Sequence, residues 1–142
     1  MIQWIYNDGG RAAAGLKGGA GDCACRAVAI AMDRPYREVA DDLNDFARRH
    51  ERPRRHPSRA RTGYHADTLR AYLAQYGIEW TPTMQIGGGC SVHLRADELP
   101  AGRLIVRLSR HFAAVIDGVL HDTHDCSRDG TRCVYGYWKI PE

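Results

Sequence analysis

The chain has 142 residues, a length that suits one domain with a single core, and 44% of its residues are hydrophobic. No apolar run approaches the length needed to cross a bilayer, and no basic region followed by an apolar core opens the chain, so we expect neither a membrane protein nor a signal peptide. The net charge of +3 is uneven, because residues 48–61 hold seven arginines and one acid, Glu51. One segment is therefore basic, whereas the rest of the chain is not.

The first half of the chain predicts a short strand followed by helices. Residues 2–6 favour the strand, and an Ala/Gly-rich loop follows over residues 11–21. Apolar side chains recur at helical spacing further on, and Pro35 and Gly77 mark helix ends. We expect three helices, at residues 23–32, 36–48 and 64–76. Two prolines and few apolar side chains make residues 48–61 an expected exposed loop or arm.

The second half predicts strands. A candidate strand at residues 78–81 and a polar, helical turn within residues 92–99 come first. Alternating or aromatic runs then favour strands at residues 103–108, 111–116, 119–123 and 133–139. Helices followed by an antiparallel sheet make an α+β fold, which we expect to form a single domain over residues 1–142.

The five cysteines are an odd number, and their spacing forms no disulfide framework. Such usage is typical of a reducing compartment, in which thiols stay free. We therefore expect a cytoplasmic protein without disulfides.

Asp117-Gly118 suits the two-residue turn of a β-hairpin. Ile116 then pairs with Val119, and alternation along the strands places His111 and Asp122 on one face as diagonal neighbours. A carboxylate beside an imidazole fixes its tautomer and raises its basicity. The alternative is that His111 merely begins an edge strand while Asp122 accepts a backbone hydrogen bond.

A cysteine opens the first expected helix, in the sequence Gly21-Asp22-Cys23. Asp22 is a good N-cap type, and Cys23 would occupy the first helical position, where free N–H groups and the helix dipole favour a thiolate. The alternative for Cys23 is a small buried hydrophobe. Cys25 projects about 200° away from Cys23 around a helix, so we assign it to packing.

These motifs resemble the papain-like cysteine peptidase superfamily, and in style they are most similar to small bacterial and phage-borne proteins of that fold. The resemblance rests on Gly21-Asp22-Cys23, on residues 109–118 (SRHFAAVIDG) and on His121-Asp122-Thr123. It implies N-terminal helices packed on an antiparallel sheet, with Cys23 as nucleophile, His111 as general base and Asp122 as the group that orients His111. Papain has a glutamine before its cysteine that helps to bind the oxyanion. Lys17 stands six residues before Cys23 here, and Lys17, Asn7 and the Cys23 backbone N–H are the candidate donors.

The sequence leaves three other interpretations open. Zinc-ligand types occur at His121, His124, Cys126 and Cys133, although strand alternation separates the two histidines. The arginines of residues 48–61 could contact nucleic acid or an acidic protein. The chain could also be a non-catalytic binding module on this fold. We favour a thiol hydrolase, a protease or amidase acting on a peptide or amide-containing substrate, with no cofactor, no metal and no membrane partner.

Overall fold

A computed structural model describes residues 2–18 and 21–142. The expected helices and strands are present with small shifts at their ends, and together they form an α+β fold. The elements are β1 (Gln3–Tyr6), α1 (Cys23–Ala31), α2 (Tyr36–His50), α3 (Ala66–Ala74), β2 (Trp80–Pro82), the 3-10 turn η1 (Ala96–Glu98), β3 (Arg103–Leu108), β4 (His111–Ile116), β5 (Val119–Asp122) and β6 (Gly136–Lys139). Within the described residues, no helix combines the length and apolar character that crossing a membrane requires.

The six strands form one sheet in the order β1-β5-β4-β3-β6-β2. Four of the pairings are antiparallel, as expected, but β1 pairs parallel to β5. The expectation of a purely antiparallel C-terminal sheet is therefore wrong at this edge. A parallel pair needs a long crossover, and between β1 and β5 the helices and most of the sheet form it. No local sequence pattern predicts such a pairing.

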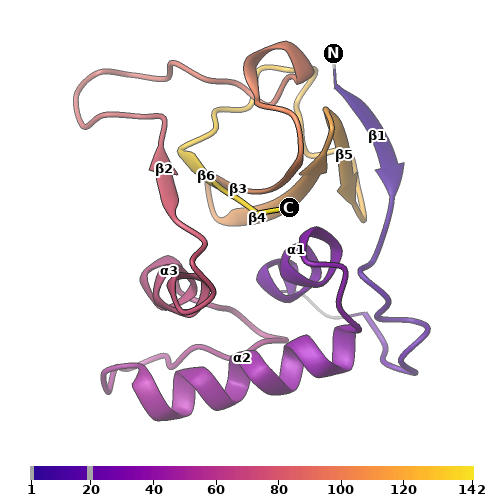
Figure 1. Ribbon diagram of the computed structural model, residues 1–142, viewed down its shortest axis with the longest axis vertical. Coiled ribbons are helices and arrows are strands. Elements are labelled where there is room, and N and C mark those ends of the chain that lie inside the picture. Colours follow the sequence, from indigo (N-terminus) through magenta and orange to yellow (C-terminus); the bar gives the residue numbers. More distant parts are fainter. Residues whose placement is uncertain (1, 19–20) are drawn as a thin grey trace.

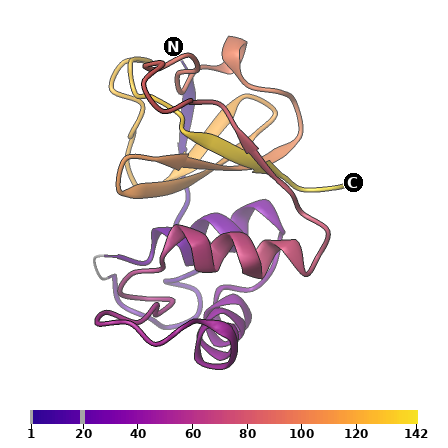
Figure 2. The ribbon, with the colours of Figure 1, turned by 90° about the vertical axis from the view of Figure 1, so that its left-hand side faces the viewer.

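The helices cover one face of the sheet. Figures 1 and 2 show α1 and α3 lying between the sheet and α2, so that α2 forms an outer layer. Buried side chains of the helices meet the sheet side chains Ile105, Phe112, Ala114 and Trp138 in one core. Loop residues Leu94, Cys126 and Val134 cover the opposite face, in a second core with the alternate positions of β3 and β4. The central strands are thus buried on both faces, which explains their nearly continuous apolar sequence.

A disulfide joins Cys90, in the loop after β2, to Cys133, shortly before β6. The expectation of no disulfides is therefore wrong, and the cysteine count no longer supports a reducing compartment. The chain brings these cysteines together from 43 residues apart by pairing β2 with β6, which their spacing did not reveal. The free cysteines are Cys23, Cys25 and Cys126.

Of the loop or arm expected at residues 48–61, the structure has a loop, over residues 51–61, which follows α2 and is mostly exposed. The helix α2 continues through His50, and Glu51 accepts hydrogen bonds from the Ser58 backbone N–H at 2.8 Å and the Thr68 hydroxyl at 2.5 Å. The Ala60 N–H donates to Asn44 Oδ1 at 2.8 Å, and both Ser58 and Ala60 are buried. The single acid of the segment therefore helps to hold its backbone against α2 and α3. Most of its arginine side chains remain exposed.

Candidate active site

The hairpin formed by β4 and β5 brings two predicted residues together. The observed pairs Ile116–Val119 and Ala114–His121 are those expected from a two-residue turn at Asp117-Gly118. His111 is the first residue of β4 and Asp122 the last of β5, so both lie at the end of the hairpin away from the turn.

His111 and Asp122 share a direct hydrogen bond, with Nε2 and Oδ2 2.6 Å apart. The His111 side chain is 12% exposed and the Asp122 side chain 2% exposed, so little water competes for this bond. Asp122 Oδ1 also accepts the Thr123 backbone N–H at 2.7 Å. Because Asp122 occupies Nε2, the other ring nitrogen of His111, Nδ1, is left for a further partner.

Helix α1 brings Cys23 to the same end of the sheet. Cys23 is the first residue of α1, the helix packs on β4, and Cys23 and His111 line one cavity. Burial alone would raise the pKa of Cys23, but hydrogen bonding to His111 and the His111 charge outweigh it, and the pKa is lowered. The Phe112 backbone N–H acts in the same direction. The site therefore stabilises a thiolate at Cys23.

The two partners of that thiolate are held in their charged forms. Burial would lower the pKa of His111, but hydrogen bonds to Asp122, Cys126 and Cys23 and the Asp122 charge raise it to about 11. Burial would raise the pKa of Asp122, but the hydrogen bond and charge of His111 lower it to about 2. At neutral pH His111 is therefore an imidazolium and Asp122 a carboxylate, and the imidazolium favours the ionised form of Cys23.

Cys25 lies in a different environment, two residues along the same helix. It is fully buried, and its thiol donates to the Tyr36 backbone carbonyl at 3.8 Å. Burial raises the pKa of Cys25 to about 12, and the nearby Asp22 charge adds to this effect. The assignment of Cys25 to packing is confirmed.

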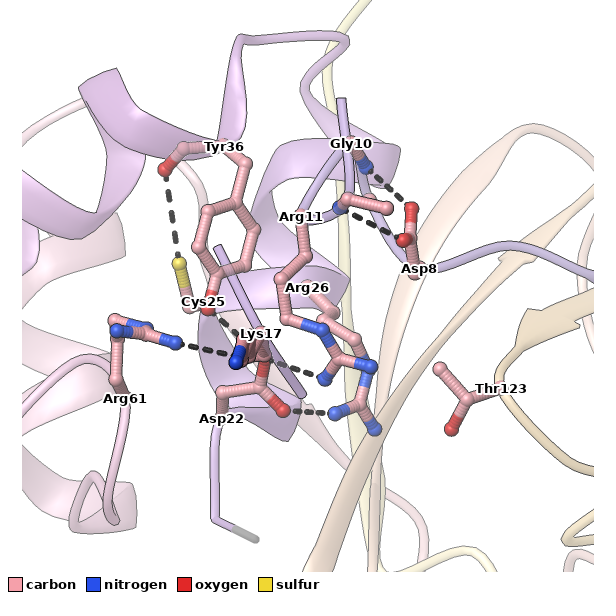
Figure 3. Close-up of polar contacts among 12 residues, drawn as sticks. Asp8, Gly10, Arg11, Lys17, Asp22, Cys25, Arg26, Tyr36, Arg61 and Thr123 are labelled. Atoms are coloured by element: carbon pink, nitrogen blue, oxygen red, sulfur yellow. Dashed lines mark hydrogen bonds and ion pairs between the residues drawn. The ribbon is translucent and has the colours of Figure 1, made fainter. Parts of the chain in front are cut away.

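Asp22 does more than was expected of an N-cap residue. Its side chain makes no capping hydrogen bond and is buried. Its carboxylate accepts hydrogen bonds from Arg11 and from the Tyr36 hydroxyl, each at 2.9 Å, and pairs with Arg26. Figure 3 shows these groups converging on Asp22. The carboxylate thus anchors two arginines beside Cys23.

Arg26 links the helix to the sheet, and the sequence analysis missed it. From a position one turn after Cys23, its guanidinium pairs with Asp22 and, at 3.3 Å, with Oδ1 of Asp122. The carboxylate that holds His111 is therefore tied to the helix that carries the thiol. The signal was present in the sequence, since a lone arginine within an apolar helix is buried only when carboxylates pair with it.

The thiol opens into a cavity of about 520 Å³. The described residues that line it are Arg11, Gly18, Gly21, Cys23, Arg26, Arg110, His111, Thr123 and His124. Two expected oxyanion donors, Lys17 and Asn7, are not among these residues, so the cavity gives neither expectation support. Lys17 is exposed and its carbonyl accepts from Arg61 at 2.7 Å (Figure 3). The Asn7 amide instead contacts His121 Nδ1 at 3.2 Å.

The zinc-ligand set suggested by the sequence does not assemble. Cys133 is in the disulfide, and His121 is bonded to Asn7. Within the described part of the chain, the groups that come together are His111, Asp122 and His124, whose ligand atoms lie within 4.8 Å of one another. These types suit a divalent metal, but His111 Nε2 and Asp122 Oδ2 already share a direct hydrogen bond at 2.6 Å. The arrangement favours acid–base chemistry.

No protein-family model, curated protein or solved structure matches the chain. The function proposed below therefore depends on the geometry and electrostatics of the site.

Proposed function

We propose that this protein is a cysteine-dependent hydrolase of the protease or amidase type, with a papain-like fold. The observation that carries the proposal is a half-buried thiol at a helix N-terminus that shares a cavity with an imidazole bonded to a buried carboxylate. A helix bearing the thiol, packed on a sheet that bears the other two groups, is the arrangement that the family resemblance implies. Cys23, His111 and Asp122 also follow its chain order.

The proposed reaction has two halves. The Cys23 thiolate attacks the substrate carbonyl, and the oxygen of the tetrahedral intermediate accepts a hydrogen bond from the Cys23 backbone N–H, which has no partner within the helix. The His111 imidazolium gives its proton to the leaving amine or alcohol as the carbon–nitrogen or carbon–oxygen bond breaks, leaving a thioester on Cys23. Neutral His111 then takes a proton from water, whose oxygen attacks the thioester. The acid product and the thiolate–imidazolium pair result.

Asp122 orients His111 and stabilises its charged form in both halves. Arg26 is a positioning residue, because it contacts Asp122 rather than the reacting atoms. Through the contact between Arg26 and Asp122, helix α1, which carries Cys23, also helps to position the carboxylate that orients His111.

Alkylation of Cys23 tests the proposal directly. Iodoacetamide at pH 6 should label Cys23 at least about 10-fold faster than it labels 2-mercaptoethanol, because only a thiol with a lowered pKa is ionised there. Cys25 in the same molecule is the internal control and should remain unlabelled in the folded protein. Labelling of Cys23 no faster than the model thiol would contradict the proposal.

Acylation tests the next step. p-Nitrophenyl acetate should release a burst of about one equivalent of nitrophenolate and leave an acetyl group on Cys23, detected by peptide mass spectrometry. Cys23→Ser should lose the burst, whereas Cys25→Ser should retain it. Rapid alkylation without acylation would indicate a reactive thiol that is not a hydrolase.

A second candidate function rests on residues 48–61. Arg52, Arg55 and Arg59 are exposed and form no ion pair among the described residues. They line grooves of about 550 and 610 Å³ on the surface of the segment. Unpaired arginines of this kind bind phosphates or acidic side chains, so the alternative is a binding module that contacts nucleic acid or an acidic protein.

A further inference from the structure

The ionisable side chains that line the cavity around the candidate nucleophile are mostly basic. Three arginines and two histidines line the cavity, and no Asp or Glu is among its described lining residues. The two nearby carboxylates, Asp22 and Asp122, are buried behind this lining. A reactant that enters the cavity therefore meets cationic groups.

Most of this positive charge is already balanced. Arg11 and Arg26 pair with Asp22, and Arg26 and His111 pair with Asp122. With Cys23 counted as the thiolate of the proposed reaction, these buried and partly buried groups comprise three cations and three anions. Charge at the cavity that could attract a substrate must therefore come from another residue.

Arg110 is that residue. It is exposed, lines the cavity beside His111, and forms no ion pair with any described carboxylate. Its position in the tight turn between β3 and β4 fixes its backbone next to the imidazole. The guanidinium is thus available at the rim of the cavity that contains the reacting sulfur.

The backbone at Arg110 provides an independent observation. Its φ of 53° lies in the left-handed region, which glycine and asparagine occupy at a lower steric cost than arginine. Turn chemistry alone does not favour an arginine there, whereas a cation beside the cavity gives that residue a role. Arg26 adds a second unused donor, since its buried Nε–H has no partner among the described residues.

We infer that the substrate carries an anionic group, a carboxylate or a phosphate, close to the reacting carbonyl, and that Arg110 binds it. This inference rests on the proposed function and adds a substrate class to it. Arginine suits both anions because its planar fork of N–H donors matches two oxygens at once. Neutral substrates of the same shape should react more slowly.

Two alkylating reagents that differ in charge test the inference. Iodoacetate is an anion and iodoacetamide is neutral, yet both transfer a substituted methyl group to the thiolate sulfur and release iodide. The ratio of the iodoacetate rate to the iodoacetamide rate at Cys23 should exceed the ratio for 2-mercaptoethanol by about 10-fold at low salt. It should fall as NaCl is raised, since salt screens exposed charges.

Variants test whether Arg110 causes the preference of Cys23 for the anionic reagent. Arg110→Gln should lower the ratio by about 3-fold or more, and Arg110→Lys should restore most of it because the charge is kept. Arg70→Gln removes an equal charge from the exposed surface of α3 and is the matched control, which should keep the wild-type ratio. A wild-type ratio equal to that of the model thiol, or an equal loss in Arg70→Gln and Arg110→Gln, would overturn the inference.

Protection experiments separate the two anions. At constant ionic strength, succinate or inorganic phosphate should slow the labelling of Cys23 by iodoacetamide, and the anion effective at the lower concentration identifies the group that the site prefers. Protection by neither anion would count against the inference. Slow labelling by iodoacetamide itself would instead contradict the proposed hydrolase, so the two failures are distinguishable.

Discussion

Arg26 and Arg48 both pair with aspartates, but their surroundings differ. The Arg26 side chain is 9% exposed and its partners Asp22 and Asp122 are almost completely buried, whereas Arg48 is 72% exposed beside Asp45, which is 42% exposed. Exposed pairs contribute little because water and salt screen them. Breaking a buried pair is costly, since it leaves an uncompensated charge in the interior. An arginine–aspartate pair can therefore stabilise a buried site in one region and contribute little to stability on the surface in another.

Replacing each arginine by methionine tests this difference between buried and exposed pairs, and we expect it to give the largest effect on stability. Arg26→Met should lower the free energy of unfolding by about 3–5 kcal/mol, because each of two buried aspartates loses one of its cationic partners. Arg48→Met should lower it by less than about 1 kcal/mol. Urea denaturation measures both values. Similar losses in the two variants would show that burial does not distinguish these pairs.

Arg26 should also affect the chemistry of the thiol. Arg26→Lys keeps the positive charge but loses the planar fork of N–H donors. We expect its free energy of unfolding to lie closer to the wild-type value than that of Arg26→Met. The pH midpoint for Cys23 labelling should be higher in Arg26→Met than in the wild type, because Arg26 contributes to the lowered pKa of Cys23. A purely structural role would leave this midpoint unchanged in the folded fraction of the variant.

Asp122→Asn tests the carboxylate that joins Arg26 to His111 in the buried ion-pair network. The amide keeps the shape of the carboxylate but not its charge, so His111 is less strongly oriented and protonated. The nitrophenolate burst rate should fall by about 100-fold. Asp129→Asn, at an exposed position in the loop after β5, is the control and should leave the burst rate unchanged. Equal rates in both variants would remove Asp122 from the mechanism.

The buried network also predicts how stability depends on pH. The pKa of His111 is raised from 6.5 to about 11, so its stabilisation is complete below pH 6.5 and is lost as the pH rises towards 11. The pKa of Asp122 is lowered from 3.8 to about 2, so its stabilisation is complete above pH 3.8 and is lost as the pH falls towards 2. His111→Gln should flatten the alkaline fall in the denaturation midpoint. An unchanged fall would place its origin elsewhere in the protein.

The smallest effect on stability is expected in residues 48–61. Combined replacement of Arg52, Arg55 and Arg59 by glutamine should change the free energy of unfolding by less than about 0.5 kcal/mol, because these side chains are exposed and unpaired. Fluorescence anisotropy with a single-stranded oligonucleotide over a range of salt concentrations tests the second candidate function in the same variant. A steep salt dependence that the variant loses would support nucleic-acid binding. No binding by the wild type at low salt would exclude it.

The order of the elements and one register could be predicted from the sequence alone. The Asp117-Gly118 turn and strand alternation placed Asp122 beside His111, because both depend on residues that are close in the chain. The start of α1 at Cys23 followed from the glycines before it and the apolar run after it.

Only the tertiary structure decided how these local pieces meet. The ion pair between Arg26 and Asp122 joins residues 96 positions apart, and the parallel pairing of β1 with β5 and the Cys90–Cys133 disulfide also close long loops. Such contacts depend on packing the helix layer against the sheet, which no local periodicity encodes. Local patterns therefore predicted the candidate residues, and packing over long sequence distances decided that Cys23 and His111 share one cavity.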